Sequence, residues 1–230
     1  MTTLGWLTTG EIKEIFVAEV EAAGGRVADV FDDGARIFLR GILPGEKEVT
    51  RRDRVQGGVA VRATEDDISV HPYVFRQVCK NGAIRAHAIE TREIRRVDFS
   101  TEEQAEVASA LCEAIRACSC EEAFANGAAE MRSARESSQI DLALTMMPLF
   151  ARFAQMGESR AAISFIMDRF LGGRDKSRYG LMNAVTSVAR DTRDPEVRWR
   201  LEEFGGGIAA VVATPKLGPE RARATSLVGV

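Results

Sequence analysis

The stretch Gln56–Arg85, QGGVAVRATEDDISVHPYVFRQVCKNGAIR, indicates a fold that contains antiparallel strands. The run 56–63 has the composition of a strand, the acidic segment 64–67 predicts a turn, and an extended segment resumes at residues 68–70. Further on, Asn81-Gly82 predicts a turn because both residues accept positive φ at low cost. Upstream, Asp32-Asp33-Gly34 separates two more strand-like runs, 26–31 and 35–43.

The second of these runs predicts how its strand is oriented. Ile37 and Leu39 alternate with Arg36, Phe38 and Arg40, so the two sets face opposite sides of a sheet. We expect the set with the two arginines to face outward. Pro44-Gly45 predicts a turn, and the charged segment 46–54 an exposed loop or hairpin tip.

Helices are expected on both sides of the strands. Thr8 and Glu11 form a predicted capping box for a helix that ends near residue 23. A second capping box, Ser100 with Glu103, opens a helical half, in which Pro148 is expected to kink one helix. The sequence predicts an α+β fold: a helix and antiparallel sheet in residues 1–100, a helical region packed on them in 101–213, and a flexible tail in 214–230. After the helix that begins at residue 100, helices are expected near 120–135, 139–155, 159–171, 179–190 and 195–212.

Composition limits the classes of function. The chain has 230 residues, a formal net charge of −3, four cysteines without metal or disulfide spacing, and two histidines. No apolar run is long enough to span a membrane, and the N-terminus lacks a secretory signal, so we expect a cytoplasmic protein with reduced thiols. Neither a metal site nor a cofactor is predicted. The negative net charge argues against a broad surface that coats DNA. A protein of this net charge can still carry a local basic strip that binds phosphate.

The segment that ends at Asn81-Gly82 holds the strongest candidates for function. Tyr73 and Phe75 together with Arg76 and Lys80 would combine stacking on bases with neutralisation of phosphates. In the alternative interpretation the two aromatic side chains face the core. The loop 172–178, GGRDKSR, adds a local positive excess.

For catalysis, Cys79 with His71 or His87 is the one candidate thiol–imidazole set, and no acyl-transfer signature surrounds it. No catalytic residue is assigned, and nothing in the sequence identifies the protein as an enzyme. Two alternatives stay open: an enzyme, thiol or metal-dependent, that uses the Cys79 region, and a protein-interaction module of a mobile element that uses the helical half.

Two blocks of the sequence resemble an uncharacterised family of phage- and plasmid-encoded bacterial proteins. Residues 73–82, YVFRQVCKNG, resemble its R-x-V-C-T-N-G signature, and residues 179–186, YGLMNAVT, resemble its N-A-x-T helix, which a glycine-rich helix follows in both. Lys80 stands where threonine is usual, and residues 61–64 lack the family's Asn-Ser pair. Those polar positions have suggested enzymatic activity for the family, so their loss weakens an enzyme interpretation.

The helix followed by strands is also similar in architecture to single-strand annealing recombinases, which phages and plasmids encode. That resemblance implies a homo-oligomer that binds single-stranded DNA in a basic groove and acts in recombination or replication without a cofactor. Tyr73 and Phe75 would be its stacking platforms. The cations expected in the groove are Arg36, Arg40, Arg62, Arg76, Lys80, Arg92, Arg95 and Arg96.

Overall fold

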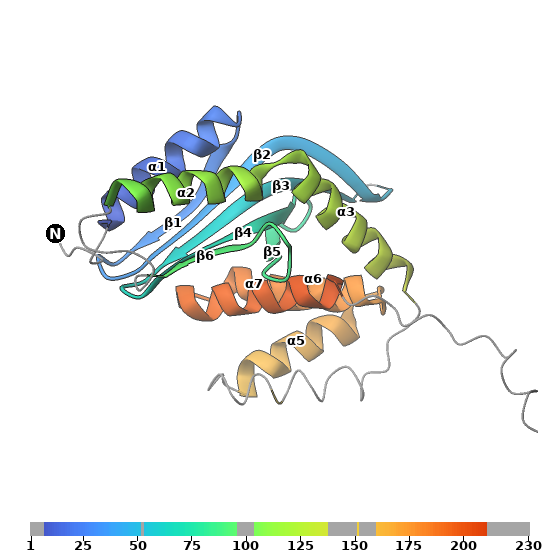
Figure 1. The fold of residues 1–230 in the computed structure, drawn as a ribbon. Coiled ribbons are helices and arrows are strands. Elements are labelled where there is room, and N and C mark those ends of the chain that lie inside the picture. The colour runs from blue at the N-terminus through green and yellow to red at the C-terminus, as the bar shows by residue number, and fades with distance from the viewer. Residues whose placement is uncertain (1–6, 52, 96–103, 138–150, 152–159, 211–230) are drawn as a thin grey trace, which may run out of the picture.

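The computed structural model describes residues 7–51, 53–95, 104–137, 151 and 160–210 and confirms the α+β fold (Figure 1). In chain order its elements are α1 (Thr9–Ala22), β1 (Arg26–Asp32), β2 (Ile37–Thr50), β3 (Asp53–Ala63), β4 (Asp67–Arg76), β5 (Asn81–Ile84), β6 (Arg92–Arg95), α2 (Gln104–Ser119), α3 (Glu121–Glu136), α5 (Arg160–Gly172), α6 (Arg178–Asp191) and α7 (Pro195–Ala210). The capping box of α1 is present as predicted, with Thr8 and Glu11 as its members.

The sheet is antiparallel and follows the order β1-β2-β3-β4-β5. Strands β5 and β6 both pair with β4, β5 along its C-terminal half and β6 along its N-terminal half. The register of β4 and β5 pairs Arg76, the last residue of β4, with Asn81, the first residue of β5.

Helices cover both faces of this sheet (Figure 1). On one face, Ile37, Leu39 and Val61 pack against the buried stripes of α1 and α2. On the other face, Phe38 and Tyr73 pack against Trp199 of α7. The alternation predicted for β2 is therefore present, but the side expected to face outward is covered by a helix.

Helix α7 approaches the sheet closely enough to require glycine. A Cβ at Gly206 would lie 2.0 Å from the carbonyl oxygen of Ile84 in β5, and one at Gly205 would lie 2.5 Å from Thr186 Cγ2 in α6. A Cβ at Gly207 would meet nothing within 4 Å. The glycine-rich run of α7 is thus explained at two of its three positions by close packing.

Two predicted turns have a different structure. Strand β2 continues through Pro44-Gly45 to Thr50, with a register shift between Ile42 and Glu46 in its pairing with β3. A bulge accommodates the proline, which cannot donate a ladder hydrogen bond. The turn after β4 has its positive φ at Lys80, 49°, whereas Asn81 and Gly82 belong to β5.

Several predictions lie outside the described residues: the capping box at Ser100 and Glu103, most of the helix expected at 139–155 with its kink at Pro148, and the tail 214–230. Within the described part of the chain, no helix is long and apolar enough to cross a membrane.

The close approach of α7 to β5 makes opposite predictions for adjacent glycines. Gly206→Ala should lower the free energy of unfolding by about 1–3 kcal/mol, because the new methyl group overlaps the Ile84 carbonyl. Gly207→Ala, its matched control, should raise that free energy by roughly 0.5–1 kcal/mol through helix propensity. Urea unfolding followed by circular dichroism measures both, and equal effects of the two variants would contradict the packing.

Candidate functional site

The two sequence blocks at 73–82 and 179–186 meet at the carboxylate of Asp53, the first residue of β3. Arg76, the last residue of β4, donates from Nε and Nη2 to this carboxylate at 2.6–2.9 Å. The Tyr179 hydroxyl, from the first turn of α6, donates to Asp53 Oδ2 at 2.9 Å. Burial raises the pKa of Tyr179, so its phenol remains a donor at neutral pH. Asp53 therefore joins two strands and a helix.

These contacts hold the plane of the Arg76 guanidinium in one orientation. The guanidinium lies over the Tyr179 ring, 5.6 Å from the ring centroid, and its Nη1 is 3.0 Å from Cys79 Sγ. The Arg76 side chain is 18% exposed. Although burial alone would lower the pKa of Arg76, the Asp53 carboxylate raises it, so the group stays charged.

A cavity of about 590 Å³ opens beside this cluster. Its wall includes Arg76 and Cys79 from the sheet side, Tyr179, Asn183 and Ser187 from α6, and the loop between α5 and α6. That volume falls in the range of small-ligand sites. The side-chain oxygen Oδ1 of Asn183 is buried and has no hydrogen-bond partner among the described residues.

The neighbouring Asn81-Gly82 has a packing role. Asn81 is buried and donates from Nδ2 to Thr186 Oγ1 at 2.7 Å, which links β5 to α6. A Cβ at Gly82 would lie 2.0 Å from the Tyr73 hydroxyl, so only glycine fits there. The dipeptide thus connects the two blocks, while Lys80 adopts the left-handed conformation just before it.

Five cations lie in the cavity wall or next to one of its residues and are named here the cationic rim. Arg135, Arg169 and Arg174 line the cavity, Lys80 follows the lining residue Cys79, and Arg190 donates to the Cys79 carbonyl at 2.6 Å. Three of them have carboxylate partners: Arg135 pairs with Asp175, and Arg169 and Arg190 both pair with Asp191. The hydrogen bonds from Arg190, the larger effect, and from Arg169 lower the pKa of Asp191 to about 2. Lys80 and Arg174 are exposed and have no ion pair with any described residue.

The loop that carries Arg174 is fixed at both of its ends. Lys176 Nζ donates to the carbonyls of Phe170, Leu171 and Gly173 at 2.7 Å each, which satisfies the C-terminus of α5. Asp175 Oδ1 accepts from the amide and the hydroxyl of Ser177, the N-cap of α6. Arg174 is therefore presented from a constrained backbone.

Three residues expected in a basic groove lie between the sheet and α7. Arg40 is 2% exposed and donates to Glu202 at 2.7 Å and to Asp29 at 2.8 Å. Tyr73 is 3% exposed, and Phe75 is half-buried against the apolar cluster that contains Tyr73 and Trp199. In this conformation Arg40 cannot reach a phosphate and Tyr73 cannot stack on a base, because α7 covers them. The alternative interpretation, in which these aromatics face the core, describes Tyr73.

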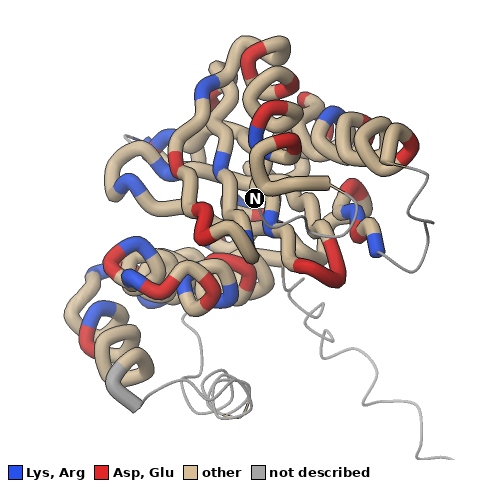
Figure 2. Tube along the Cα trace, turned by 90° about the vertical axis from the view of Figure 1, so that its left-hand side faces the viewer, with Lys and Arg blue, Asp and Glu red and all other residues tan. Residues whose placement is uncertain are grey.

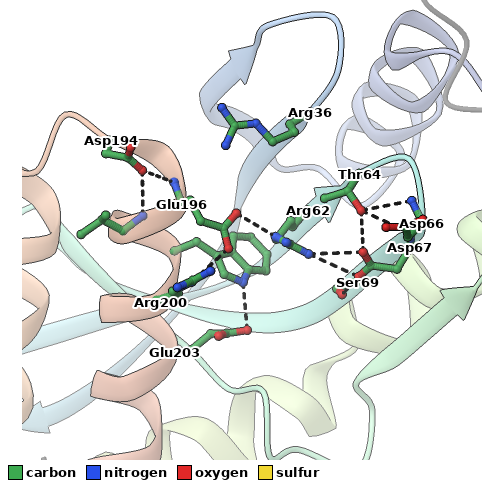
Figure 3. Close-up of polar contacts among 12 residues, drawn as sticks. Arg36, Arg62, Thr64, Asp66, Asp67, Ser69, Asp194, Glu196, Arg200 and Glu203 are labelled. Atoms are coloured by element: carbon green, nitrogen blue, oxygen red, sulfur yellow. Dashed lines mark hydrogen bonds and ion pairs between the residues drawn. The ribbon is translucent and has the colours of Figure 1, made fainter. Parts of the chain in front are cut away.

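The other predicted groove cations are dispersed and mostly paired. Arg62 lies between Asp67 and Glu196 of α7 (Figure 3). Arg36 forms an exposed pair with Asp33. At the end of β4 away from Arg76, Arg92 donates to backbone carbonyls and Arg95 pairs with Glu93. Arg96 lies outside the described residues. Basic and acidic residues are interspersed along the described chain in Figure 2, and the predicted cations Arg40, Arg62 and Arg95 are paired with carboxylates.

The candidate thiol–imidazole set is not assembled. His71 Nδ1 is 3.1 Å from Thr91 Oγ1 and its ring packs on Trp199, while His87 Nε2 is 3.2 Å from a Glu130 carboxylate oxygen. Cys79 instead lines the cavity next to Arg76. Within the described residues, no group of three or more His, Cys, Asp or Glu side chains is arranged to hold a metal ion.

The predicted site residues did not include Asp53, Tyr179, Asn183 or Arg174. Two signals for them were present in the sequence: the positive excess of the loop 172–178 and the second resemblance block at 179–186. Asp53 had no such signal, because it lies in the charged segment 46–54, which was expected to be an exposed loop or a hairpin tip.

Comparisons with known proteins do not identify the chain. No family model, curated protein or solved structure matches it.

Because Asp53 joins two strands and a helix, its charge should be needed for stability. Asp53→Asn removes the partner of the Arg76 guanidinium and should lower the free energy of unfolding by about 3 kcal/mol. Asp168→Asn removes an exposed carboxylate from the same cavity wall and should change it by less than about 0.5 kcal/mol. Urea unfolding of both variants tests this; a neutral Asp53→Asn would contradict the assigned role.

His71 should make stability depend on pH. Burial lowers the pKa of His71 to about 4, from an ordinary value of 6.5. Between these two values the unfolded chain binds a proton that the folded chain does not, so stability falls as pH drops from 6.5 to 4, by roughly 3 kcal/mol at the lower limit. The free energy of unfolding across this range should vary less in His71→Gln than in the wild-type protein, and an equal pH dependence of the two proteins would contradict a buried, neutral His71.

Proposed function

We propose that this protein binds single-stranded DNA in the cytoplasm without a cofactor, with the phosphates of the strand at the cationic rim. The observation that carries the proposal is the pair Lys80 and Arg174. Both are exposed, Arg174 lines the cavity and Lys80 directly follows the lining residue Cys79, and neither is neutralised by a carboxylate of the described chain. Cations without an internal partner are the ones that release counterions when phosphate binds.

The local charge supports an anionic ligand here despite the net charge of −3. Arg76 and the five rim cations lie in or next to the cavity wall with four carboxylates, those of Asp53, Asp168, Asp175 and Asp191. Three of these carboxylates are bound to arginines or to Tyr179. The positive charges of Lys80 and Arg174 are therefore left to attract anionic groups outside the protein.

The left-handed backbone of Lys80 supports the same location. A lysine at φ 49° is less favourable than glycine or asparagine there, and such strain concentrates at binding sites. The expected homo-oligomer remains a prediction. Light scattering with and without oligonucleotide tests it independently of the site.

Removing the two unpaired cations should weaken oligonucleotide binding. For Lys80→Ala/Arg174→Ala we expect the slope of log K against log salt to decrease in magnitude by about 1.4, which corresponds to two lost phosphate contacts. Fluorescence anisotropy with a labelled oligonucleotide, titrated at several salt concentrations, measures the change.

The control is Lys13→Ala/Arg26→Ala, which removes the same charge from two exposed positions on α1 and β1, outside the cavity wall. It should retain the wild-type slope. Equal losses in the two double variants would mean that net charge, not the rim, governs binding. No binding of the wild-type protein at low salt would refute the function.

A further inference from the structure

We propose that the cavity is a nucleotide subsite, in which one nucleobase stacks on the guanidinium of Arg76 and its phosphate contacts the cationic rim. This inference rests on the proposed function in one respect: the nucleotide is taken to belong to a bound single strand. The same chemistry would hold a free nucleoside monophosphate, and the experiment below separates these two sources.

Arg76 is suited to be the stacking platform. The Asp53 carboxylate and Cys79 Sγ engage its nitrogens, and the Tyr179 ring packs on it at 5.6 Å. These contacts fix the plane before any ligand arrives, while the exposed 18% of the side chain borders the cavity. Arginine guanidinium planes stack on unpaired bases, and a platform that is already ordered loses little entropy on binding.

Asn183 supplies the polar contact to the edge of the base. Its amide hydrogen bond lowers the pKa of Tyr179, in opposition to burial, which is the largest effect. The Oδ1 of Asn183, a residue that lines the cavity, is buried and has no hydrogen-bond partner in the described chain. Buried polar atoms are rarely left unsatisfied, and an N–H of a base would satisfy this one once the Asn183 side chain turns toward the cavity.

Two arginines that line the same cavity provide contacts for the phosphate. Arg169 Nη1 is held by Ser187 Oγ at 2.7 Å, and Arg174 projects from the loop that Lys176 and Asp175 fix. Both arginines line the cavity that Asn183 also borders. The base-binding and phosphate-binding groups thus belong to one cavity of about 590 Å³.

Isothermal titration with deoxynucleoside monophosphates, ribose 5-phosphate and inorganic phosphate tests the inference. At least one of the monophosphates should bind about tenfold more tightly than ribose 5-phosphate, the contribution expected from stacking one base. Asn183→Ala should weaken nucleotide binding and leave ribose 5-phosphate unaffected, whereas Arg174→Ala should weaken both. Asn126→Ala, at an exposed position on α3 outside the cavity wall, is the matched control and should change neither.

Arg76→Lys provides a second readout, since it retains the charge and removes the plane. Thermal unfolding first establishes that this variant is folded; the comparison of Asn183→Ala with Asn126→Ala tests the inference independently of that result. Equal affinities for nucleotide and ribose 5-phosphate would overturn the inference.

The two proposals can fail separately. Oligonucleotide binding that depends on Lys80 and Arg174, without competition from monophosphates and without an effect of Asn183→Ala, would overturn the subsite and leave the proposed function intact. Monophosphate binding without any affinity for oligonucleotides would support the subsite for a free nucleotide and overturn the DNA-binding function.

Discussion

The ion pair between Arg40 of β2 and Glu202 of α7 is the interaction on which the arrangement of the two halves depends. Both side chains are about 2% exposed, and they meet at 2.7 Å. A charge so deeply buried is strongly destabilising without its partner, so α7 can cover this face only where Glu202 meets Arg40. Arg198 and Asp29 extend the pair to β1 and further restrict that position. Packing provides the area of this interface, and the ion pair provides its register.

The position of α7 in turn determines where a ligand can bind. With the central face of the sheet covered, the cations expected there become internal partners of carboxylates, as Arg62 does with Glu196. Helix α6 packs against both α7 and β5, where Gly205 accommodates Thr186 and Asn81 bonds to the same threonine. This packing brings Tyr179 to Asp53 and so forms the wall of the cavity. The candidate site is therefore at the corner of the sheet rather than across its face.

Local patterns were sufficient to predict the elements but not their partners. The capping box at Thr8, the alternation in β2 and most helix positions follow from interactions within a few residues, and they are confirmed. Arg40 was expected on the surface because an arginine is rarely buried without a partner, and its partner lies 162 residues away in the chain. Asn81-Gly82 was expected to form a turn, but both residues belong to β5. Their partners are also distant in the chain or hidden from the local pattern: the Asn81 amide bonds to Thr186, and Gly82 leaves room for Tyr73. Neither contact has a signal in the neighbouring sequence.

The same pairing explains why net charge is a poor guide to ligand binding in this protein. Many carboxylates that contribute to the value of −3 are bound to arginines inside the fold, including those of Glu202, Glu196 and Asp53. An arginine that is already bound to a carboxylate has little counterion to release, so it contributes little to the affinity for a phosphate. The electrostatic contribution must come from cations that folding leaves unpaired. In the described chain, Lys80 and Arg174 meet that condition beside a cavity whose buried amide oxygen also lacks a partner. The location of charge that is free after folding, rather than its total, is what places the candidate ligand at this corner.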